Sequence, residues 1–173
     1  MRTILAGTFA LAACITAACG DVKTPTQQSG QEPAVAFASV DQKTAFASRR
    51  RSGDCSIDLV DGKPAGDRIV LRAGSTARIE GWAADGETNS VPAQAAILLR
   101  STERSYYAYA LRGLHRDDVA KASGIAAFAT SGYVVSAGTD AVRPGDYSAR
   151  LIQQTRSGRI ECDTGKTIEV TAR

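Results

Sequence analysis

The sequence predicts an all-β fold built from two sheets packed face to face. Eight or nine short segments between residues 55 and 171 alternate apolar with polar side chains, or run through β-branched and aromatic residues. Both patterns are typical of strands. Turn signals rich in Gly, Pro, Asn and Asp separate these segments at intervals of roughly 8 to 12 residues, a spacing typical of sandwiches. No long apolar helix competes with this interpretation.

The first three predicted strands occupy residues 55–60, 69–71 and 76–84. Trp82, the one tryptophan of the chain, lies near the end of the third strand. A buried indole removes roughly 150 to 250 Å² from water. We therefore expect Trp82 to anchor the core.

The next two predicted strands, residues 94–100 and 105–111, are joined by a short polar link. Three tyrosines of the second strand, Tyr106, Tyr107 and Tyr109, are the candidate ligand-binding residues, because their rings give large contact area at low entropic cost. Alternation places Tyr107 and Tyr109 on one face and Tyr106 on the other. We expect the first face to fill the core and Tyr106 to be exposed.

The rest of the chain predicts one helical turn and four strands. Asp117 is placed to cap a short helix that ends near residue 122. A Pro-Gly-Asp turn precedes Tyr147, whose hydroxyl we expect to bond back to the backbone, as in a tyrosine corner. The strands are expected at residues 131–135, 147–154, 159–162 and 167–171.

The N-terminus predicts a secretory leader. Residues 1–18 hold one arginine and then an uncharged run of small and apolar residues, shorter than the roughly 20 residues that span a bilayer. An Ala-Ala-Cys sequence ending at Cys14, and a second ending at Cys19, resemble the lipobox of bacterial lipoproteins, whose cysteine is acylated. Cys14 has the closer match before it but leaves a leader of 13 residues, whereas Cys19 leaves 18.

Cysteine pairing favours Cys19 as the lipid attachment site, with Cys14 as the alternative. If Cys19 is acylated, Cys14 leaves with the leader, and Cys55 and Cys162 remain to form a disulfide with no spare thiol. Ordinary cleavage of a secretory leader is a third interpretation. The lipoprotein resemblance, with Gly20 and not Asp after Cys19, implies an acyl anchor in the outer membrane, facing the periplasm.

Three parts of the chain are therefore expected: a signal peptide at residues 1–18, a lipidated flexible tether at residues 19–54 and a β-sandwich domain at residues 55–173. The tether is polar and without apolar periodicity up to residue 33, as in a disordered linker. Residues 34–48 are ambiguous between a short helix and loose packing on the domain. The three arginines at residues 49–51 are either a solvated charge run or a contact with anionic lipid.

Four short motifs occur in an order that resembles bacterial immunoglobulin-like accessory domains, a group associated with cell-envelope and glycan-related membrane proteins. The resemblance implies an immunoglobulin-like β-sandwich of about seven to nine strands. Asp117 departs from the pattern, which has proline there, and the disulfide and tryptophan spacing of antibody domains is absent. The motifs lie at residues 81–85, 116–120, 131–133 and 144–147.

Composition and motifs argue against several function classes. The formal net charge is +3, and loss of residues 1–18 leaves 20 basic against 18 acidic groups, which does not fit a dedicated nucleic-acid binder. His115 is the single histidine, and no G-x-S-x-G nucleophile motif accompanies it, so no catalytic residue is expected. Asp85, Glu87 and Asn89 lack the spacing of a calcium loop, and no metal or cofactor is expected.

We interpret the chain as a membrane-anchored cell-envelope lipoprotein that acts as a non-catalytic binding or structural module. Its expected partners are the membrane, through the acyl anchor, and an envelope glycan or another envelope protein. The alternative is a small periplasmic hydrolase or glycan-modifying enzyme whose carboxylates converge only in the fold. A concave pocket that gathers His115 with two or more carboxylates would favour the enzyme.

Overall fold

The computed structural model describes residues 34–41, 49–51 and 53–173, with side chains for all but residues 49–51. The chain separates into residues 1–30 and 31–173, and the description below concerns the second part. The predicted signal peptide and both candidate acylation sites, Cys14 and Cys19, lie outside the described residues, as does most of the predicted tether.

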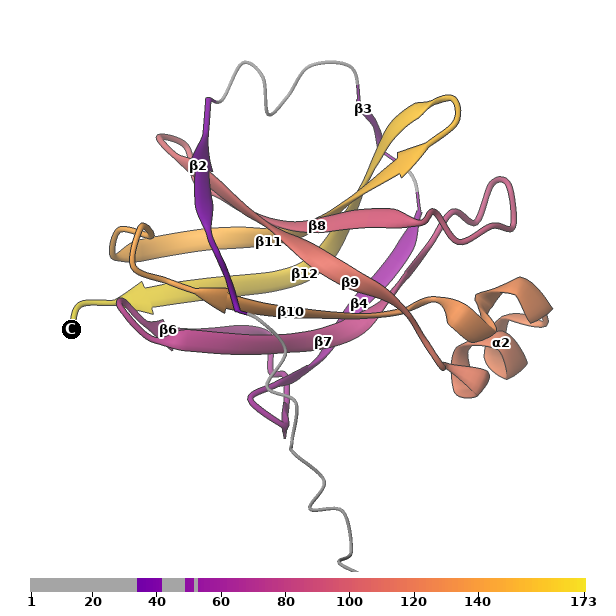
Figure 1. Ribbon diagram of the computed structural model, residues 1–173, viewed down its shortest axis with the longest axis horizontal. Coiled ribbons are helices and arrows are strands. Elements are labelled where there is room, and N and C mark those ends of the chain that lie inside the picture. Colours follow the sequence, from indigo (N-terminus) through magenta and orange to yellow (C-terminus); the bar gives the residue numbers. More distant parts are fainter. Residues whose placement is uncertain (1–33, 42–48, 52) are drawn as a thin grey trace, which may run out of the picture. The chain divides into compact units, whose positions relative to one another are not determined.

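The described residues form an all-β, sandwich-like fold, which confirms the predicted fold class (Figure 1). Twelve strands occur in this part of the chain. Four of them, β1, β2, β3 and β5, are only two or three residues long, so that eight carry most of the sheet. The elements are β1 (Val35–Ala36), β2 (Ala38–Val40), β3 (Arg49–Arg51), β4 (Asp54–Val60), β5 (Lys63–Pro64), β6 (Arg68–Arg72), β7 (Thr76–Ala84), β8 (Gln94–Arg100), β9 (Ser105–Leu114), α2 (Asp117–Ser123), the 3-10 helix η1 (Ala126–Thr130), β10 (Gly132–Gly138), β11 (Gly145–Thr155) and β12 (Gly158–Thr171).

One curled sheet supplies both layers of the sandwich, in the strand order β3-β12-β11-β8-β9-β10-β7-β4-β5. Strand β9 belongs to both layers, because its first half pairs with β8 and its last residues pair with β10. We call the layer of β5, β4, β7 and β10 sheet A, and the layer of β8, β11 and β12 sheet B. The short strand β6 pairs with the end of β12.

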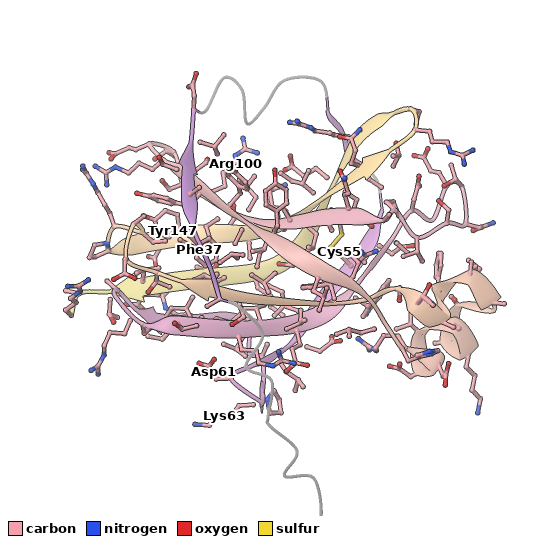
Figure 2. The ribbon with its side chains drawn as sticks, viewed as in Figure 1. Phe37, Cys55, Asp61, Lys63, Arg100 and Tyr147 are labelled. Atoms are coloured by element: carbon pink, nitrogen blue, oxygen red, sulfur yellow. A yellow bond between two sulfur atoms is a disulfide. The ribbon has the colours of Figure 1, made fainter. Side chains whose placement is uncertain are left out.

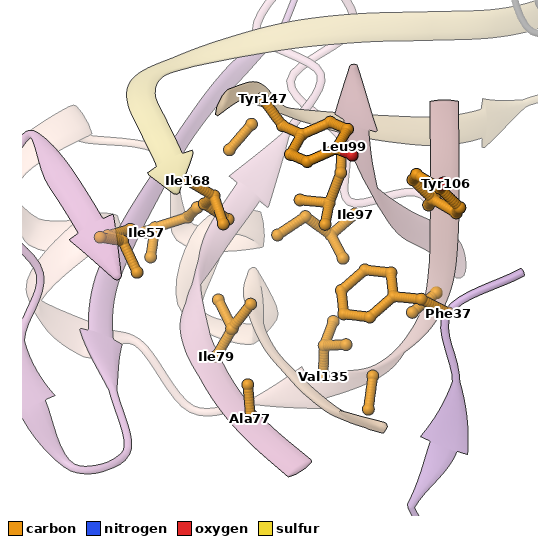
Figure 3. Close-up of a cluster of buried hydrophobic side chains, with 14 of the residues drawn as sticks. Phe37, Ile57, Ala77, Ile79, Ile97, Leu99, Tyr106, Val135, Tyr147 and Ile168 are labelled. Carbon is orange, nitrogen blue, oxygen red and sulfur yellow. The ribbon is translucent and has the colours of Figure 1, made fainter. Parts of the chain in front are cut away.

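Residues 35–40 fill the gap where β9 and β10 diverge. Strand β1 pairs with β10 and strand β2 pairs with β9. Between them Phe37 is 1% exposed and points toward Ile97 and Val135 (Figure 3). The folded part therefore begins before residue 55, its expected start, because the core needs the apolar area that Phe37 buries.

A disulfide joins β4 and β12, the strands next to the two ends of the curled sheet. Cys55 on β4 and Cys162 on β12 are bonded, with their Cα atoms 6.1 Å apart, as predicted (Figure 2). No ladder pairs β4 with β12 in the described part of the chain. The disulfide thus holds together the side of the sandwich where backbone hydrogen bonds do not, and it links sheet A to sheet B.

Tyr133 holds the core position that was expected for Trp82. Its side chain is fully buried and lies across the strand pair from Gly81, and its hydroxyl donates to the carbonyl of Ser56 at 2.9 Å. A Cβ at position 81 would lie 2.0 Å from that carbonyl oxygen and 2.8 Å from the Tyr133 hydroxyl oxygen. Glycine at position 81 therefore leaves room for this hydrogen bond on the inner face of β7.

The expectation that Trp82 anchors the sandwich core is wrong. Residues 77, 79, 81 and 83 of β7 face the core, so alternation turns Trp82 to the outer face of sheet A. There it is partly buried in a second cluster with Ala84, Val119 of α2 and Phe128 of η1. The two helices thus cover Trp82 from outside the sandwich.

The predicted tyrosine corner is confirmed. Tyr147 is 3% exposed, and its hydroxyl donates to the carbonyl of Arg143, four residues earlier, at 2.7 Å. Its ring packs edge-on against Tyr106, with ring centroids 5.8 Å apart. This burial raises the pKa of Tyr147, so its hydroxyl stays protonated and remains a hydrogen-bond donor.

Candidate functional site

The three candidate tyrosines divide between the two faces of β9, but in the opposite sense to the prediction. Tyr106 is 4% exposed and belongs to the core, whereas Tyr109 is 66% exposed and Tyr107 is half-buried on the same outer face. Inside, the Tyr106 ring meets Tyr147, and its hydroxyl accepts from the backbone N–H of Arg143 at 3.5 Å. The tyrosine corner therefore draws Tyr106 inward, and Tyr107 and Tyr109 face outward.

Tyr107 and Tyr109 form one wall of a cavity of about 270 Å³ on the outer face of sheet B. Their rings stand edge to face, with centroids 5.4 Å apart and an interplanar angle of 87°, a favoured aromatic geometry. The floor of the cavity comes from β8 and β11, and Val40 of β2 also lines the cavity. We call this cavity the tyrosine groove. Its apolar lining residues are Val40, Ala95, Ala96, Leu98, Tyr107, Tyr109 and Ile152.

Strand pairing explains why these side chains meet. Ala96 of β8 lies opposite Tyr109 on one side and Ile152 on the other, and Leu98 lies opposite Tyr107. Leu98 is 1% exposed although it faces away from the sandwich core. Sheet B therefore carries apolar side chains on its outer face as well, which a one-sided antiparallel sheet does not do.

A polar row closes one end of the groove. Gln94 of β8 lies opposite Gln154 of β11, which in turn lies opposite Arg159 of β12, and all three line the cavity. The Arg159 guanidinium donates to the Gln154 side-chain oxygen at 3.4 Å. Sequence reasoning missed this row. The two-residue turn at residues 156–157 pairs Gln154 with Arg159, but no local signal connects Gln94 to them.

The carboxylates beside the groove are already engaged by other arginines. Glu161 accepts from Arg150 at 3.0 Å, and Arg100 lies 3.6 Å from the same oxygen. Arg150 also contacts Asp163 at 2.9 Å. Arg159 lines the groove, and within the described residues it makes no ion pair.

The outer face of sheet A is organised differently, around an arginine that serves the backbone. Arg112 donates to the carbonyls of Ala83 at 2.8 Å, Ser131 at 3.0 Å and Pro92 at 3.3 Å. Burial lowers its pKa to about 10, which leaves it charged at neutral pH. It ties β7, β9 and the start of β10 together under the helices, and we assign it a structural role.

The segment around His115 is exposed and brings one carboxylate near the imidazole. The His115 side chain is 82% exposed and lies 3.9 Å from Asp117. Helix α2 begins after Arg116 without a side-chain cap, so the expectation that Asp117 caps it is wrong. Arg116 instead binds both oxygens of Asp118, at 2.9 and 2.7 Å, and reaches Asp58 on β4, which fastens the helix to sheet A.

The acidic loop after β7 folds around its own backbone. Asp85 is buried, and its carboxylate accepts from the backbone N–H of Glu87 at 3.1 Å. Asn89 adopts a left-handed conformation with φ of 51°, which asparagine tolerates in turns. Within the described part of the chain, no three His, Cys, Asp or Glu side chains are arranged to hold a metal ion.

Comparisons with known proteins connect this chain to one solved structure and to no family. No family model matches the sequence. No curated protein matches it either. Domains 4 and 5 of the S-layer protein SbsC are similar at 15% identity with a TM-score of 0.31, over 71% of this chain and 55% of that chain. Because the similarity is this low, the fold assignment depends on the strand pairing above.

The described helices are short elements on the surface of the sandwich. Among them, none has both the length and the apolar character needed to cross a membrane.

Proposed function

We propose that the protein is a lipid-anchored module of the bacterial cell envelope that binds a ligand in the tyrosine groove and catalyses no reaction. The disulfide between Cys55 and Cys162 is the observation that carries this proposal. Disulfides form and persist in oxidising compartments outside the cytoplasm. A bond that closes the sandwich therefore supports export, in agreement with the leader-like residues 1–18.

The anchor follows from the Ala-Ala-Cys sequences at the end of the leader. Acylation at Cys19, or at Cys14 as the alternative, would hold the chain on a membrane, because each buried methylene contributes about 0.8 kcal/mol. Gly20 after Cys19 favours the outer membrane, facing the periplasm. Both described cysteines are consumed by the disulfide, so the remaining candidates for acylation are the two that precede the described residues.

The tyrosine groove supports a binding role. Exposing the apolar ring of Tyr109 to water is unfavourable in free energy, and a partner that covers the ring removes this cost. Tyrosine rings are enriched at binding surfaces. The partner is an envelope glycan or another envelope protein. The exposed position of His115, with one carboxylate near it, supports the non-catalytic role over the hydrolase alternative.

Metabolic labelling with an alkyne fatty acid tests the anchor. Expressed in a Gram-negative host, wild type and Cys14→Ala should both be labelled, whereas Cys19→Ala should lose the label and leave the outer-membrane fraction. Loss of the label only in Cys14→Ala would move the anchor to Cys14. Absence of label from the wild-type chain would overturn the lipoprotein proposal.

A further inference from the structure

The chemistry of the tyrosine groove narrows the class of ligand, given the binding role proposed above. Strands β8 and β11 form its floor, and each is paired along both edges, β8 with β9 and β11, and β11 with β8 and β12. Neither can accept a further strand, so a peptide cannot bind here by strand addition. The ligand must be recognised through side chains alone.

The wall and floor of the groove offer a flat apolar surface of limited size. Tyr109 is held perpendicular to Tyr107 and is 66% exposed, so that its ring is presented in a fixed orientation at low entropic cost. Ala96, directly across from Tyr109, is small and leaves room beside the ring. A cavity of about 270 Å³ is slightly smaller than the roughly 300 to 1,000 Å³ typical of small-molecule sites, which suits one ring-sized group.

The polar row of Gln94, Gln154 and Arg159 supplies hydrogen-bond donors, hydrogen-bond acceptors and one positive charge. The side-chain amide of Gln94 offers donors and an acceptor, which matches a hydroxyl-rich ligand. The Gln154 amide donates to the Thr155 carbonyl at 3.1 Å and accepts from Arg159, so its second N–H is the donor that it offers to a ligand. The Arg159 guanidinium is a planar donor suited to a carboxylate. Because Glu161 and Asp163 are occupied by Arg150, the charge of Arg159 is available to the ligand.

We propose that the tyrosine groove binds an acidic sugar residue of an envelope glycan. The pyranose ring stacks on Tyr109, its hydroxyls meet Gln94 and Gln154, and its carboxylate pairs with Arg159. A neutral sugar gains the stacking but not the ion pair. The site therefore selects acidic over neutral sugars, and the selectivity falls as salt screens the ion pair.

A matched pair of sugars tests this selectivity on the full chain purified in detergent. Methyl β-glucuronide and methyl β-glucoside differ at C6 alone, where one carries a carboxylate and the other a hydroxymethyl group. Titrations followed by NMR at low salt should show the glucuronide binding at least fivefold more tightly. Arg159→Gln should remove that preference and leave glucoside affinity unchanged, and Tyr109→Ala should weaken both sugars at least tenfold.

Two control variants match these substitutions. Arg72→Gln removes the same charge from the exposed end of β6, outside the groove, and Leu111→Ala truncates an exposed apolar side chain on the same face of β9, also outside it. Both should bind like wild type. Tyr109 and Arg159 are exposed, so their variants should keep the wild-type melting temperature, which confirms that lost affinity is not lost folding.

The outcomes separate this inference from the proposed function. Equal affinity for both sugars, still dependent on Tyr109, would overturn acid selectivity and leave the groove as a binding site. Absence of sugar binding, with self-association that Tyr109→Ala abolishes in sedimentation, would replace the glycan with a second copy of the chain. Failure of acyl labelling would overturn the anchor without changing either sugar result.

Discussion

The outer faces of the two sheets each carry aromatic side chains, and the described elements cover Trp82 on sheet A but leave Tyr109 on sheet B exposed. On sheet A, Trp82 is packed under α2 and η1, in a cluster with Val119 and Phe128. On sheet B, Tyr109 remains 66% exposed beside a cavity lined with apolar and polar side chains. Similar outward positions therefore have different roles, and the covering elements decide between them.

The outer face of sheet A contributes to stability, and the outer face of sheet B is the candidate surface for recognition. The covered face is fastened by Arg112, which bonds three backbone carbonyls, and by Arg116, which holds Asp118 and Asp58. The uncovered face has its carboxylates neutralised by Arg150 while Arg159 has no ion pair among the described residues. Substitutions on sheet A should therefore affect unfolding, and substitutions in the groove should affect binding.

The largest loss of stability is expected from removing the disulfide that links sheet A to sheet B. Replacing Cys55 and Cys162 together by serine should lower the free energy of unfolding by about 4 to 5 kcal/mol, because the disulfide closes a loop of more than 100 residues. Urea unfolding of the oxidised wild type and of the double variant measures it. A loss below about 1 kcal/mol would show that the pairing of β9 with both layers holds the sandwich closed without the disulfide.

The second largest loss of stability is expected when a side chain that covers Trp82 is truncated. Phe128 is 2% exposed, and Phe128→Ala should lower the free energy of unfolding by about 3 to 5 kcal/mol through lost burial and a cavity. Tryptophan fluorescence should shift to longer wavelength as Trp82 gains solvent. Leu111→Ala is the control for an uncovered apolar residue and should change stability by less than about 0.5 kcal/mol. Equal losses in the two variants would erase the distinction between the faces.

A pH-dependent effect is expected where helix α2 meets sheet A. The hydrogen bond from Arg116 lowers the pKa of Asp118 from 3.8 to about 2. A carboxyl with a lowered pKa in the folded state stabilises it above its unfolded pKa, and that contribution is lost as the pH falls toward 2. Asp118→Asn should therefore be less stable than wild type at pH 6, and the difference should shrink between about pH 4 and pH 2.

The neighbouring carboxylate provides the control for that titration. Asp117 has an 87% exposed side chain and makes no bond to Arg116 in the described contacts, so Asp117→Asn should follow the wild-type pH profile. Urea unfolding at several pH values measures both variants. A deficit in Asp118→Asn that stays constant from pH 6 to pH 2 would contradict the assigned pair.

The smallest effect on stability is expected in the groove. Tyr109→Ala should change the free energy of unfolding by no more than about 0.5 kcal/mol, since the ring is exposed and its substitution leaves no cavity in the core. Differential scanning calorimetry beside Phe128→Ala measures the contrast. A destabilisation similar to that of Phe128→Ala would make Tyr109 a structural residue.

Local features of this fold could be predicted from the sequence. Which face of each strand points into the core could not. The tyrosine corner was predictable because Tyr147 and its partner Arg143 are four residues apart across one turn. The cysteine pair followed from elimination. Alternation defines two faces of a strand without saying which is buried, and for this reason Tyr106 and Trp82 were assigned to the wrong sides.

The candidate site was only half visible for the same reason. The sequence indicated the tyrosine strand. Gln94 meets Gln154 only through the pairing of β8 with β11, because these two residues are 60 positions apart in the sequence. Phe37 was also missed as a core residue, because its burial depends on the gap between β9 and β10 and not on its neighbours in sequence.

Tyrosine nitration in the intact envelope tests most directly whether the uncovered face is the ligand surface. In the purified chain Tyr109 should react fastest with tetranitromethane, Tyr107 more slowly, and the buried Tyr106, Tyr133 and Tyr147 hardly at all, as mass spectrometry of the peptides resolves. In cells Tyr109 should be strongly protected by its ligand. Equal nitration of Tyr109 in cells and in the purified chain would show that no ligand covers this face.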